Sequence, residues 1–583
     1  MEEKNIDIEV VRHSLSHILA AAVLKMFPEA KLGIGPAIEN GFYYDFGLPR
    51  ALAPEDLGAI EKEMRRIITG GELFDKTEEP VAEMRKKYQA AHQDYKVELL
   101  DDIQKEGGTN ATLYRLGDFD DLCKGPHIAS AKELANIGFK LDKIAGAYWR
   151  GDEKRPMLQR VYGLAFPSAQ ALKDFLRQRE EAEKRDHRKL GAELDLFSFH
   201  EEAPGMPFWH DKGRVIFDLL VEHWHTVQAK YGYLEVRFPN LLDVRLWKQS
   251  GHYEHYKNNM FFVESGEKKM ALRPMDCPGA ILYYKEKLHS YQELPLRLSE
   301  LGTVFRDEKS GELHGLMRVQ QITQDDAHVF VTQDQIKSEV VQILAILEEL
   351  YKPFGMEYKV YLSTKPDDAA GDAKIWARAE KALAEALEKN GVKYDLKEKD
   401  GAFYGPKIDI EIKDSLGRSW QTGTVQLDFF MPENFGLEYI GQNGKAERPI
   451  IIHRALMGSL ERFIGVLLEH TAAALPLWLS PVQARIITVS EKFDDYARKV
   501  KKGLEGAGVR VELDISSDTL GKKIRDGELN KVPYLLIVGE KESSAQTVAV
   551  RQRGRGDIGA TKVNEFLQDI KNELKASFQV GFD

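Results

Sequence analysis

The sequence predicts an α+β multidomain fold, with an N-terminal α/β domain, a middle domain built on an antiparallel sheet and a C-terminal α/β domain. The chain has 583 residues, of which 43% are hydrophobic and 30% charged, so it can bury several cores and is not a disordered chain. Residues 407–413 alternate strictly between polar and apolar, and a turn then leads to a second extended run ending at Phe430, which indicates antiparallel sheet. Beyond residue 481, strand and helix patterns alternate, which is typical of a small α/β domain with a largely parallel sheet.

The N-terminal block, residues 1–166, carries two helical patterns. The first contains His13 and His17, and their spacing of four places both imidazoles on one face of a helix. The second begins at Pro54 and has apolar residues three or four positions apart. Between these helices, over residues 33–44, we expect turns and a strand.

A long helical pattern opens after Pro167 and reaches about Leu196. Its middle is dense in charges of both signs, which is typical of a solvated face, so we predict a connecting helix over residues 167–199. The middle block spans residues 200–479 and ends in a proline-bounded stretch. In the C-terminal block, residues 480–583, we expect strands at 486–489, 509–513 and 533–539 and helices at 493–504 and 519–529.

Charge and cysteine content exclude several classes of protein. The 82 Lys+Arg and 93 Asp+Glu residues give a net charge of −11, which excludes a uniformly basic coat for nucleic acid. Residues from 481 onward carry 18 basic and 16 acidic side chains, so contact with a polyanion is more plausible at that end. Only two cysteines occur, which excludes a disulfide scaffold and favours the reducing cytoplasm. The sequence predicts neither a signal peptide nor a membrane span, since its longest apolar stretch is broken by Glu469 and His470.

Two pairs of residues in the N-terminal block form a candidate site. His13-x3-His17 and Cys123-x3-His127 together supply three imidazoles and one thiol. This set could bind zinc, or it could form a metal-free site that positions water and substrate. Either pair alone is more often incidental, but two pairs in one block favour a site.

Two further patterns in the middle block are weak when taken singly. Arg306 and Arg318 lie on what we interpret as two strands joined by a loop, and guanidinium groups suit phosphate oxygens. Residues 458–463 place a glycine before a helix that carries Arg462, which suits a nucleotide. Charged hairpins and glycines before helices are common, so neither pattern alone identifies a function.

Longer motifs resemble one family of enzymes. Arg306-Asp307-Glu308 is similar to motif 2 of class II aminoacyl-tRNA synthetases, and residues 458–463 are similar to motif 3. The stretches 323–328, 401–407, 423–428 and 452–455 resemble the threonyl-tRNA synthetases in particular. The two histidine-containing pairs resemble the editing domain of that family, and residues 520–525 resemble its anticodon-binding domain. The resemblance implies an editing domain over 1–166, a connecting helix over 167–199, a class II catalytic domain over 200–479 and an anticodon-binding domain over 480–583.

The resemblance also implies an activity and its partners. A member of this family is expected to activate L-threonine with ATP and Mg2+, transfer it to the 3′ end of threonine tRNA, and hydrolyse mischarged seryl-tRNA. A homodimer is expected from the class II fold. Many bacterial members carry a small additional N-terminal domain, which we expect this chain to lack.

Residue roles follow from the positions that match the family's motifs. One zinc ion per chain would be held by Cys277, His328 and His453, although no local spacing pairs these three residues. Threonine would be bound by Gln324, Asp326, Tyr404 and Gln426. ATP would be bound by Arg306, Glu308, Arg318, Gln421 and Arg462. Catalysis would involve Arg306, Arg462, Lys407 and, for transfer to the tRNA, His252. Editing would involve His13, His17, Lys96, Asp121, Cys123 and His127. Anticodon bases would contact Glu542 and Arg551.

The editing residues leave open whether a metal ion is present. Related editing domains of alanyl-tRNA synthetases are thought to hold zinc with such residues, whereas the threonyl family is thought to work without it. We predict a metal-free site, because a closed four-ligand zinc has no open position for water.

Three residues depart from the family's usual pattern. Asp276 and Ala280 stand where an asparagine and a histidine flank the zinc cysteine, and Ile322 stands where many members place a phenylalanine beneath adenine. They are the only support for a non-catalytic RNA-binding paralogue. The other alternative, a different class II synthetase such as the prolyl enzyme, is disfavoured by Cys277 with its two histidines. Because the zinc ligands and both motif arginines are present, we expect an active enzyme.

Overall fold

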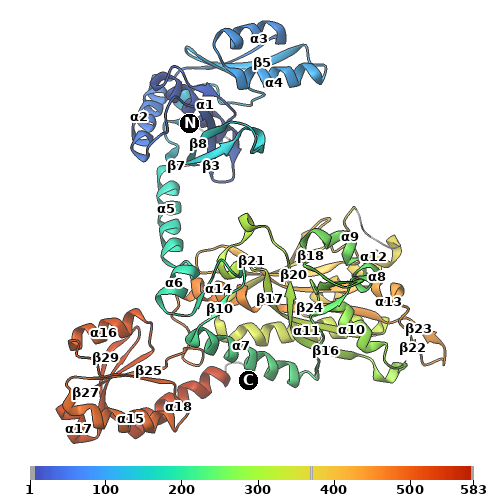
Figure 1. The fold of residues 1–583 in the computed structure, drawn as a ribbon, viewed down its shortest axis with the longest axis vertical. Coiled ribbons are helices and arrows are strands. Elements are labelled where there is room, and N and C mark those ends of the chain that lie inside the picture. Colours follow the sequence, from blue (N-terminus) through green and yellow to red (C-terminus); the bar gives the residue numbers. More distant parts are fainter. Residues whose placement is uncertain (1–6, 368, 370–371, 580–583) are drawn as a thin grey trace. The chain divides into compact units, whose positions relative to one another are not determined.

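The computed structural model describes residues 7–367, 369 and 372–579. The chain forms two compact units, Met1–Glu180 and Glu181–Asp583 (Figure 1). Both units combine helices with β-sheets, which confirms the α+β class. Each unit is described by itself below.

The first unit is built on an antiparallel sheet with strand order β1-β3-β8-β7, and β2 pairs with β3. Its strands are β1 (Lys31–Leu32), β2 (Ala37–Ile38), β3 (Gly41–Gly47), β7 (Gly138–Tyr148) and β8 (Met157–Phe166). Helix α1 (Ile8–Met26) packs against β3 and against α2 (Pro54–Gly70), and Leu15, Ile18 and Leu19 of α1 are fully buried. Helix α2 begins at Pro54 as predicted.

A smaller three-stranded sheet completes the first unit. It contains β4 (Phe74–Pro80), β5 (Asn110–Leu116) and β6 (Phe119–Leu122), all antiparallel. Helices α3 (Val81–Ala90) and α4 (Asp94–Lys105) lie between β4 and β5 in the chain and pack on each other.

The prediction of one continuous connecting helix over residues 167–199 is wrong. The structure has two helices, α5 (Ala169–Lys184) and α6 (His187–Glu193), followed by strand β9 (Phe197–Ser198). Asp186 leaves helical geometry with a ψ of 121°, and its side chain accepts the backbone N–H of Arg188 as the N-cap of α6. An aspartate that satisfies the first amides of a new helix ends the preceding one, and the charge pattern alone does not reveal this.

An eight-stranded sheet dominates the second unit, with strand order β11-β16-β17-β24-β21-β20-β18-β19. The central strands are antiparallel, whereas the edge strands β11 and β19 pair in parallel with their neighbours. The strands are β11 (Leu234–Glu235), β16 (Leu296–Phe305), β17 (Gln321–Val331), β18 (Glu357–Ser363), β19 (Tyr394–Lys397), β20 (Lys407–Lys413), β21 (Ser419–Asp428) and β24 (Ile450–Ser459). The predicted hairpin is confirmed as β20 and β21.

Helices and small sheets surround this sheet. The helices are α7 (Asp211–Lys230), α8 (Val244–Gln249), α9 (His252–Tyr256), α10 (Cys277–Tyr284), α11 (Ile336–Tyr351), α12 (Ala373–Lys389), α13 (Phe430–Asn434) and α14 (Leu460–Thr471). The small sheets consist of β9 with β10 (Phe208–Trp209), of β12 (Leu241–Asp243), β13 (Phe262–Ser265) and β14 (Lys268–Leu272), and of β15 (His289–Ser290), β22 (Tyr439–Ile440) and β23 (Ala446–Glu447).

The C-terminal part of the second unit has a mixed sheet with strand order β26-β25-β27-β28-β29. Its strands are β25 (Ala484–Thr488), β26 (Val511–Asp514), β27 (Tyr534–Val538), β28 (Thr547–Gln552) and β29 (Gly556–Lys562). The first three strands are parallel as predicted, but β28 and β29 add an antiparallel hairpin that the sequence reading missed. The helices are α15 (Asp494–Glu505), α16 (Leu520–Leu529), α17 (Glu540–Ala545) and α18 (Val563–Gln579).

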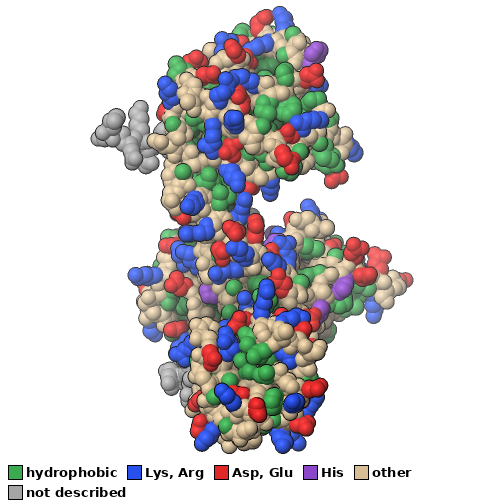
Figure 2. Space-filling view, turned by 90° about the vertical axis from the view of Figure 1, so that its left-hand side faces the viewer, with side chains coloured by type: hydrophobic (Ala, Val, Ile, Leu, Met, Phe, Trp, Pro, Cys, Tyr) green, Lys and Arg blue, Asp and Glu red, His purple; other side chains and the backbone are tan. Residues whose placement is uncertain are grey.

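The surface carries charges of both signs. Figure 2 shows Lys and Arg side chains interspersed with Asp and Glu on the face drawn, in agreement with the exclusion of a uniformly basic coat. Within the described residues, no helix combines the length and the apolar character that crossing a lipid bilayer requires.

Candidate active sites

A cleft of about 690 Å³ lies over the middle strands of the eight-stranded sheet. Side chains alternate between the two faces of a strand, so Ile322, Gln324, Asp326 and His328 of β17 all reach the cleft. In register, His328 lies opposite His453 of β24, and His453 lies opposite Gln426 of β21. The sheet thus brings together residues that are far apart in the sequence.

Cys277, His328 and His453 form a compact buried group in this cleft. One ligand atom from each lies within 4.8 Å of the other two. Cys277 opens helix α10, so the helix start places its thiol beside the two strand histidines. Burial raises the pKa of the Cys277 thiol and lowers the pKa of the His328 imidazole, so a bound cation would offset the cost of the thiolate.

The surroundings of these residues fit a metal ion. His328 Nε2 and His453 Nδ1 are buried and have no hydrogen-bond partner among the described residues. His453 donates its other ring N–H, from Nε2, to Asp428 Oδ2 at 2.9 Å, which leaves Nδ1 free as a ligand. A thiol with two imidazoles is a donor set that zinc prefers, and three protein ligands leave a fourth position for substrate.

The predicted threonine-binding residues lie around this group. Gln324, Asp326, Tyr404 and Gln426 all line the cleft. Tyr404 donates its hydroxyl hydrogen bond to Gln426 Oε1, and Gln426 Nε2 donates to Thr424 Oγ1 at 3.0 Å. Burial and the nearby Asp325 carboxylate raise the pKa of Asp326.

Positive charge gathers in another part of the cleft. Arg306 and Arg462 line it, and Arg462 donates from Nε to Met317 O at 2.9 Å and from Nη1 to Gln421 O at 3.2 Å. Burial lowers the pKa of Arg462, and the positive charges of Arg306 and Arg318 lower it further. An anion would relieve this repulsion, so this part of the cleft suits phosphate groups.

Arg306 and Arg318 do not lie on strands, contrary to what the sequence predicted. Arg306 follows the end of β16 and Arg318 precedes β17, so each lies in the connecting loop and not on a strand. Arg318 donates to Glu308 Oε2 at 2.7 Å, and neither of these two is among the described residues that line the cleft. Lys407 and Gln421 do line it, and both contact Asp409, with Lys407 Nζ 3.0 Å from Oδ2 and Gln421 Nε2 2.9 Å from Oδ1.

His252 is buried and is not among the described residues that line the cleft. It is fully buried, its Nδ1 is 2.7 Å from Ser250 Oγ, and its Nε2 has no partner within the described part of the chain. Burial, followed by the charges of His453 and Arg306, lowers the pKa of His252 to about 3, so the ring is neutral at pH 7. Its helix neighbours His255 and Tyr256 line the cleft, and His255 stacks on Phe403 with ring centroids 4.2 Å apart.

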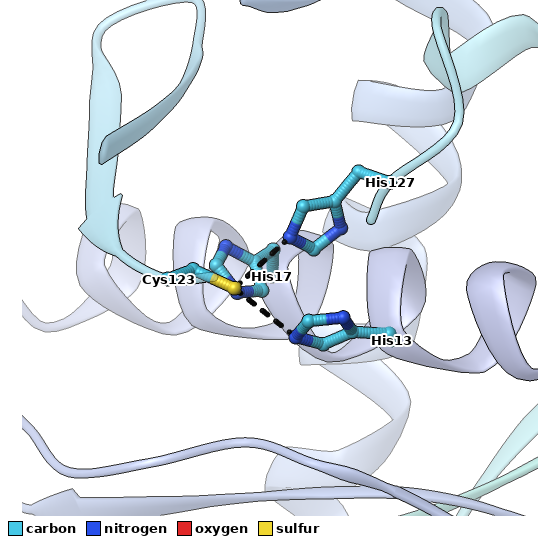
Figure 3. A group of neighbouring side chains, drawn as sticks. All are labelled: His13, His17, Cys123 and His127. Carbon is cyan, nitrogen blue, oxygen red and sulfur yellow. Dashed lines mark hydrogen bonds between the residues drawn. The ribbon is translucent and has the colours of Figure 1, made fainter. Parts of the chain in front are cut away.

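The second candidate site lies in the first unit (Figure 3). His13 and His17 come from α1, whereas Cys123 and His127 come from the loop after β6. Cys123 Sγ lies 3.2 Å from His13 Nε2 and 3.3 Å from His127 Nε2. The four side chains are therefore brought together as the sequence predicted.

Hydrogen bonds orient the two imidazoles that face Cys123. His13 Nδ1 lies 3.2 Å from Pro126 O, a carbonyl that can only accept, so His13 Nε2 carries the lone pair. His127 Nδ1 lies 3.1 Å from Ser14 Oγ, whose own proton goes to Val10 O at 2.8 Å. Both Nε2 atoms are thus acceptors that converge on one thiol, which is an arrangement that can hold water or a cation.

A buried ion pair lies behind this group. Lys96 Nζ is 2.5 Å from Asp121 Oδ1, and Tyr44 donates its hydroxyl hydrogen bond to Asp121 Oδ2 at 2.5 Å. His17 Nδ1 lies 3.9 Å from the same carboxylate. Lys96 and Asp121 are each 1% exposed, so solvent does not separate this ion pair from the histidines. Among the four residues of the group, His17 is the one that lies next to it.

The imidazoles of this site are held neutral. Burial lowers the pKa of His13 and, more strongly, of His17. Burial and the charges of His17 and His13 lower the pKa of His127 to about 2. Burial raises the pKa of the Cys123 thiol to about 11. At pH 7 the rings are therefore unprotonated and can accept hydrogen bonds, while the thiol keeps its proton.

The predicted anticodon contacts lie in the C-terminal part. Arg551 is on β28, and its Nη2 lies 3.3 Å from Glu528 Oε1. Glu542 is in α17, where its Oε2 accepts the backbone N–H of Gly539 at 2.9 Å. Glu542 therefore caps its own helix.

Some residues that shape the sites were not found from the sequence. Asp428 orients His453, and Tyr44 holds Asp121. Asp428 ends one of the family-like stretches, but its role is evident only from strand pairing. Tyr44 lies in an aromatic run that reads equally well as core.

Three family models match separate parts of the chain. The model described as "Threonyl and Alanyl tRNA synthetase second additional domain" matches residues 111–162. The "tRNA synthetase class II core domain (G, H, P, S and T)" matches residues 260–471, and the "Anticodon binding domain" matches residues 483–573. Each match falls inside one of the segments predicted from the sequence.

Solved structures agree with these matches. The RNA-binding domain of threonyl-tRNA synthetase from Cryptosporidium parvum is 41% identical, with a TM-score of 0.64, over 67% of this chain and 98% of that one. A prolyl-tRNA synthetase from Giardia lamblia, determined with prolyl-adenylate, is 18% identical, with a TM-score of 0.54, over 69% of this chain and 80% of that one. At that identity the second comparison supports the shared fold alone.

Full-length relatives identify the family. The threonine–tRNA ligases of Acetivibrio thermocellus and Carboxydothermus hydrogenoformans are each 51% identical over 97% of this chain and 89% of their own length. That of Clostridium tetani is 50% identical over 97% of this chain and 88% of its own. On this similarity, the chain belongs to the threonine–tRNA ligase family.

Proposed function

We propose that this chain is a threonine–tRNA ligase that activates L-threonine with ATP, charges threonine tRNA and hydrolyses mischarged seryl-tRNA. The observation that carries the proposal is the buried group of Cys277, His328 and His453, with two unpartnered ring nitrogens in a cleft that also holds Arg306 and Arg462. Family membership supports the same reaction.

The first step joins threonine to AMP. A carboxylate oxygen of threonine attacks the α-phosphorus of ATP, the bond to the β-phosphate bridging oxygen breaks, and diphosphate leaves with its Mg2+. Arg306 and Arg462 position the phosphates and neutralise the charge that builds up during the attack. Lys407, at the cleft wall beside Asp409, adds a further positive charge.

Selection against valine takes place in the same cleft. Cys277, His328 and His453 would hold a zinc ion, which supplies an open coordination position for the amino and hydroxyl groups of threonine. Asp326 accepts the proton of that hydroxyl, while Gln324, Tyr404 and Gln426 enclose the side chain. Valine lacks the hydroxyl and leaves these polar groups unpaired, which costs far more than the loss of apolar contact.

The second step transfers threonine to tRNA. A ribose hydroxyl of the terminal adenosine attacks the threonyl carbonyl, and AMP leaves. The Ser250 hydroxyl donates to Trp247 O at 3.2 Å, so it accepts from His252 Nδ1 and leaves the lone pair on His252 Nε2. That atom can accept a hydrogen bond from the ribose hydroxyl. The C-terminal part would contact anticodon bases, with Arg551 forking onto a guanine and Glu542 accepting from base amino groups.

Serine requires a second site. It has the hydroxyl and lacks one methyl group, a difference worth only ~1–3 kcal/mol in a binding pocket. In the first unit, water attacks the seryl ester carbonyl, and the ester C–O bond breaks to give serine and the free 3′ end. His13 can accept the water's proton through Nε2, and His127 Nε2 can accept a hydrogen bond from the same water. Lys96 and Asp121 form a buried ion pair beside His17.

The proposal includes a homodimer in the cytoplasm. Exposed apolar side chains on and beyond α10 support a dimer surface, with Leu282 and Tyr283 each 43% exposed and Leu288 65% exposed. The reduced thiols on which both sites depend fit the cytoplasm.

The direct test is ATP–pyrophosphate exchange with threonine, serine and valine and with a panel of the other amino acids that includes proline, with zinc measured on the same sample. We expect exchange with threonine, weaker exchange with serine, essentially none with valine, and one zinc per chain. Exchange that depends on proline would favour another class II specificity. Absence of exchange with any amino acid, on a sample that binds tRNA, would favour the non-catalytic paralogue.

A further inference from the structure

The ladder between β17 and β24 is interrupted beside the cleft. Asp326 pairs with Ala455, but Gln324 pairs with Ser459, so two positions along β17 correspond to four along β24. Residues 456–458 therefore arch out of the ladder, and their backbone N–H groups lose their partners on β17. We call residues 456–458 the β24 arch.

One buried carboxylate satisfies the whole arch. Asp325 is fully buried, and its Oδ1 accepts from Leu456 N at 3.0 Å and from Gly458 N at 2.7 Å. Its Oδ2 accepts from Leu456 N and from Met457 N, each at 3.1 Å. The Arg454 guanidinium lies 3.9 Å from Oδ2. All three amides of the arch thus depend on Asp325.

A second buried carboxylate, which follows β24, accepts a backbone hydrogen bond from β17. Glu461, in the first turn of α14, accepts the Thr323 N–H at 3.1 Å with Oε1 and 2.9 Å with Oε2. It also accepts the Ser459 hydroxyl hydrogen bond at 2.8 Å. Thr323 is the β17 residue next to the interruption. Asp325 and Glu461 therefore tie β17 and the β24–α14 junction together from both sides, and we call the pair the carboxylate clasp.

The clasp sets the direction in which the chain enters α14. Gly458 has a φ of 70°, and a Cβ there would lie 2.2 Å from Thr422 O, so the arch has one tight geometry. The next residue, Ser459, caps α14 by accepting the Arg462 N–H at 3.2 Å. Gly458, Ser459 and Arg462 line the cleft, whereas Asp325 and Glu461 do not line it within the described residues.

We propose that Asp325 and Glu461 are positioning residues that hold Gly458, Ser459 and Arg462 in the geometry that binds ATP. The inference rests on the proposed function, because it assigns ATP to this part of the cleft. Asp325 lies between Gln324 and Asp326, which are assigned to threonine, but the antiparallel ladder with β16 holds that stretch of β17 on its other edge. The other residues assigned to threonine, Tyr404 and Gln426, come from other segments. Loss of the clasp should therefore affect ATP more than threonine.

The two carboxylates predict different tolerances to an amide. Asp325→Asn keeps one acceptor oxygen for three N–H groups and turns an NH2 group toward them, so the arch cannot stay satisfied. Glu461→Gln keeps an acceptor for its single backbone amide and can donate to Ser459 Oγ. In pyrophosphate exchange, Asp325→Asn should raise the KM for ATP about tenfold or more, with the KM for threonine changed less than about threefold. Glu461→Ala removes both acceptor oxygens and should raise the KM for ATP selectively, as Asp325→Asn does. Glu461→Gln, which keeps one acceptor, should restore both KM values to within about threefold of wild type.

The matched control is Glu339→Gln. Glu339 is a buried residue of α11 in the same unit, and its carboxylate accepts two hydrogen bonds of 2.7 Å from Arg297. Neither residue is among the described residues that line the cleft. Thermal unfolding and zinc content are measured for all variants, and zinc should stay at the wild-type level. Three results would overturn the proposal. They are a selective rise of the KM for ATP in Glu339→Gln, an equal rise of the KM values for ATP and threonine in Asp325→Asn, and an unchanged KM for ATP in Asp325→Asn.

Two further measurements keep the test decisive. If Asp325→Asn does not fold, Gly458→Ala displaces the same arch while both carboxylates are retained. An unchanged KM for ATP in Gly458→Ala would overturn the proposal. If wild-type protein shows no threonine-dependent exchange, the proposed function fails by itself. The clasp is then tested by calorimetric titration with ATP alone, where Asp325→Asn should bind about tenfold or more weakly and unchanged affinity would contradict it.

Discussion

A single carboxylate decides which nitrogen of His453 faces the cleft. Asp428 accepts the Nε2–H of His453, and its other oxygen accepts the N–H groups of Phe430 and Met431 at 2.7 and 2.9 Å. The carboxylate is thus fixed by backbone and in turn fixes the imidazole tautomer. The His453 imidazole is therefore already oriented toward Cys277 and His328 before any substrate binds.

Removal of the thiol tests the metal group. Cys277→Ala should lose the zinc and, with it, threonine activation, because two imidazoles alone hold zinc weakly. The measurement is metal content together with threonine-dependent exchange. The control is Cys123→Ala in the first unit, which should keep both. A Cys277→Ala protein that activates threonine at the wild-type rate would exclude this assignment.

The cleft residue Ile322 gives a second prediction at this scale. Ile322 lines the cleft, at the position where the family resemblance implies a side chain beneath adenine. Aromatic stacking on a base is worth ~1–3 kcal/mol, so Ile322→Phe should lower the KM for ATP by roughly fivefold or more. Ile322→Leu is the size-matched control and should not change it. Equal KM values in the two variants would mean that adenine does not lie against this residue.

At the scale of elements, α1 combines a buried packing face with His13 and His17, the two histidines proposed for editing. Residues 14–23 of α1 are all buried, and His17 is 3% exposed among them. The pKa values of His13, His17 and His127 are lowered mainly by burial, so the folded site excludes protons that an unfolded chain would bind. The stability of this unit is therefore linked to pH.

The sign of that linkage is definite. Below the ordinary imidazole pKa of 6.5, the unfolded state binds more protons than the folded state. The free energy of unfolding therefore has its full contribution from these histidines above pH 6.5 and decreases as the pH falls below it. For His17 the loss is at most about 1.4 kcal/mol per pH unit. Hydrogen exchange of α1 peptides, corrected for intrinsic rates, should show lower protection at pH 5.5 than at pH 7.5. His17→Gln should show a smaller loss, and equal losses in the two proteins would contradict the assigned burial effect.

Sequence patterns predicted some elements well and others poorly, for physical reasons. The β20–β21 hairpin and the start of α2 depend on local alternation and on Pro54, so both were predicted. The break at Asp186 and the hairpin of β28 and β29 were not, since a cap competes with helix propensity and the edge strand β29 carries glycine and polar residues. The three residues proposed to bind zinc come from three elements, so only the family resemblance, and not spacing, suggested Cys277, His328 and His453. The β24 arch depends on a register shift that no local pattern shows.

For the whole molecule, recognition of tRNA and activation of threonine should be separable. Arg551 lies in the C-terminal part, where its Nη2 forms an ion pair with Glu528 at 3.3 Å. Arg551→Ala should weaken tRNA charging by roughly tenfold or more while leaving pyrophosphate exchange unchanged, because a bidentate base contact is worth ~1–3 kcal/mol. Arg498→Ala, an exposed arginine on α15, is the control and should charge normally. A parallel fall of exchange and charging would assign Arg551 a structural role.

The central claim is that two separate sites divide the rejection of wrong amino acids. Its most direct test is a charging assay with serine, using wild type, His13→Ala and His17→Ala, with zinc measured on each protein. Wild type should show almost no seryl-tRNA, whereas both variants should accumulate it while charging threonine normally and holding about one zinc per chain. Two zinc ions in wild type and one in His13→Ala would contradict the metal-free editing site, and no accumulation of seryl-tRNA in either variant would contradict the second site itself.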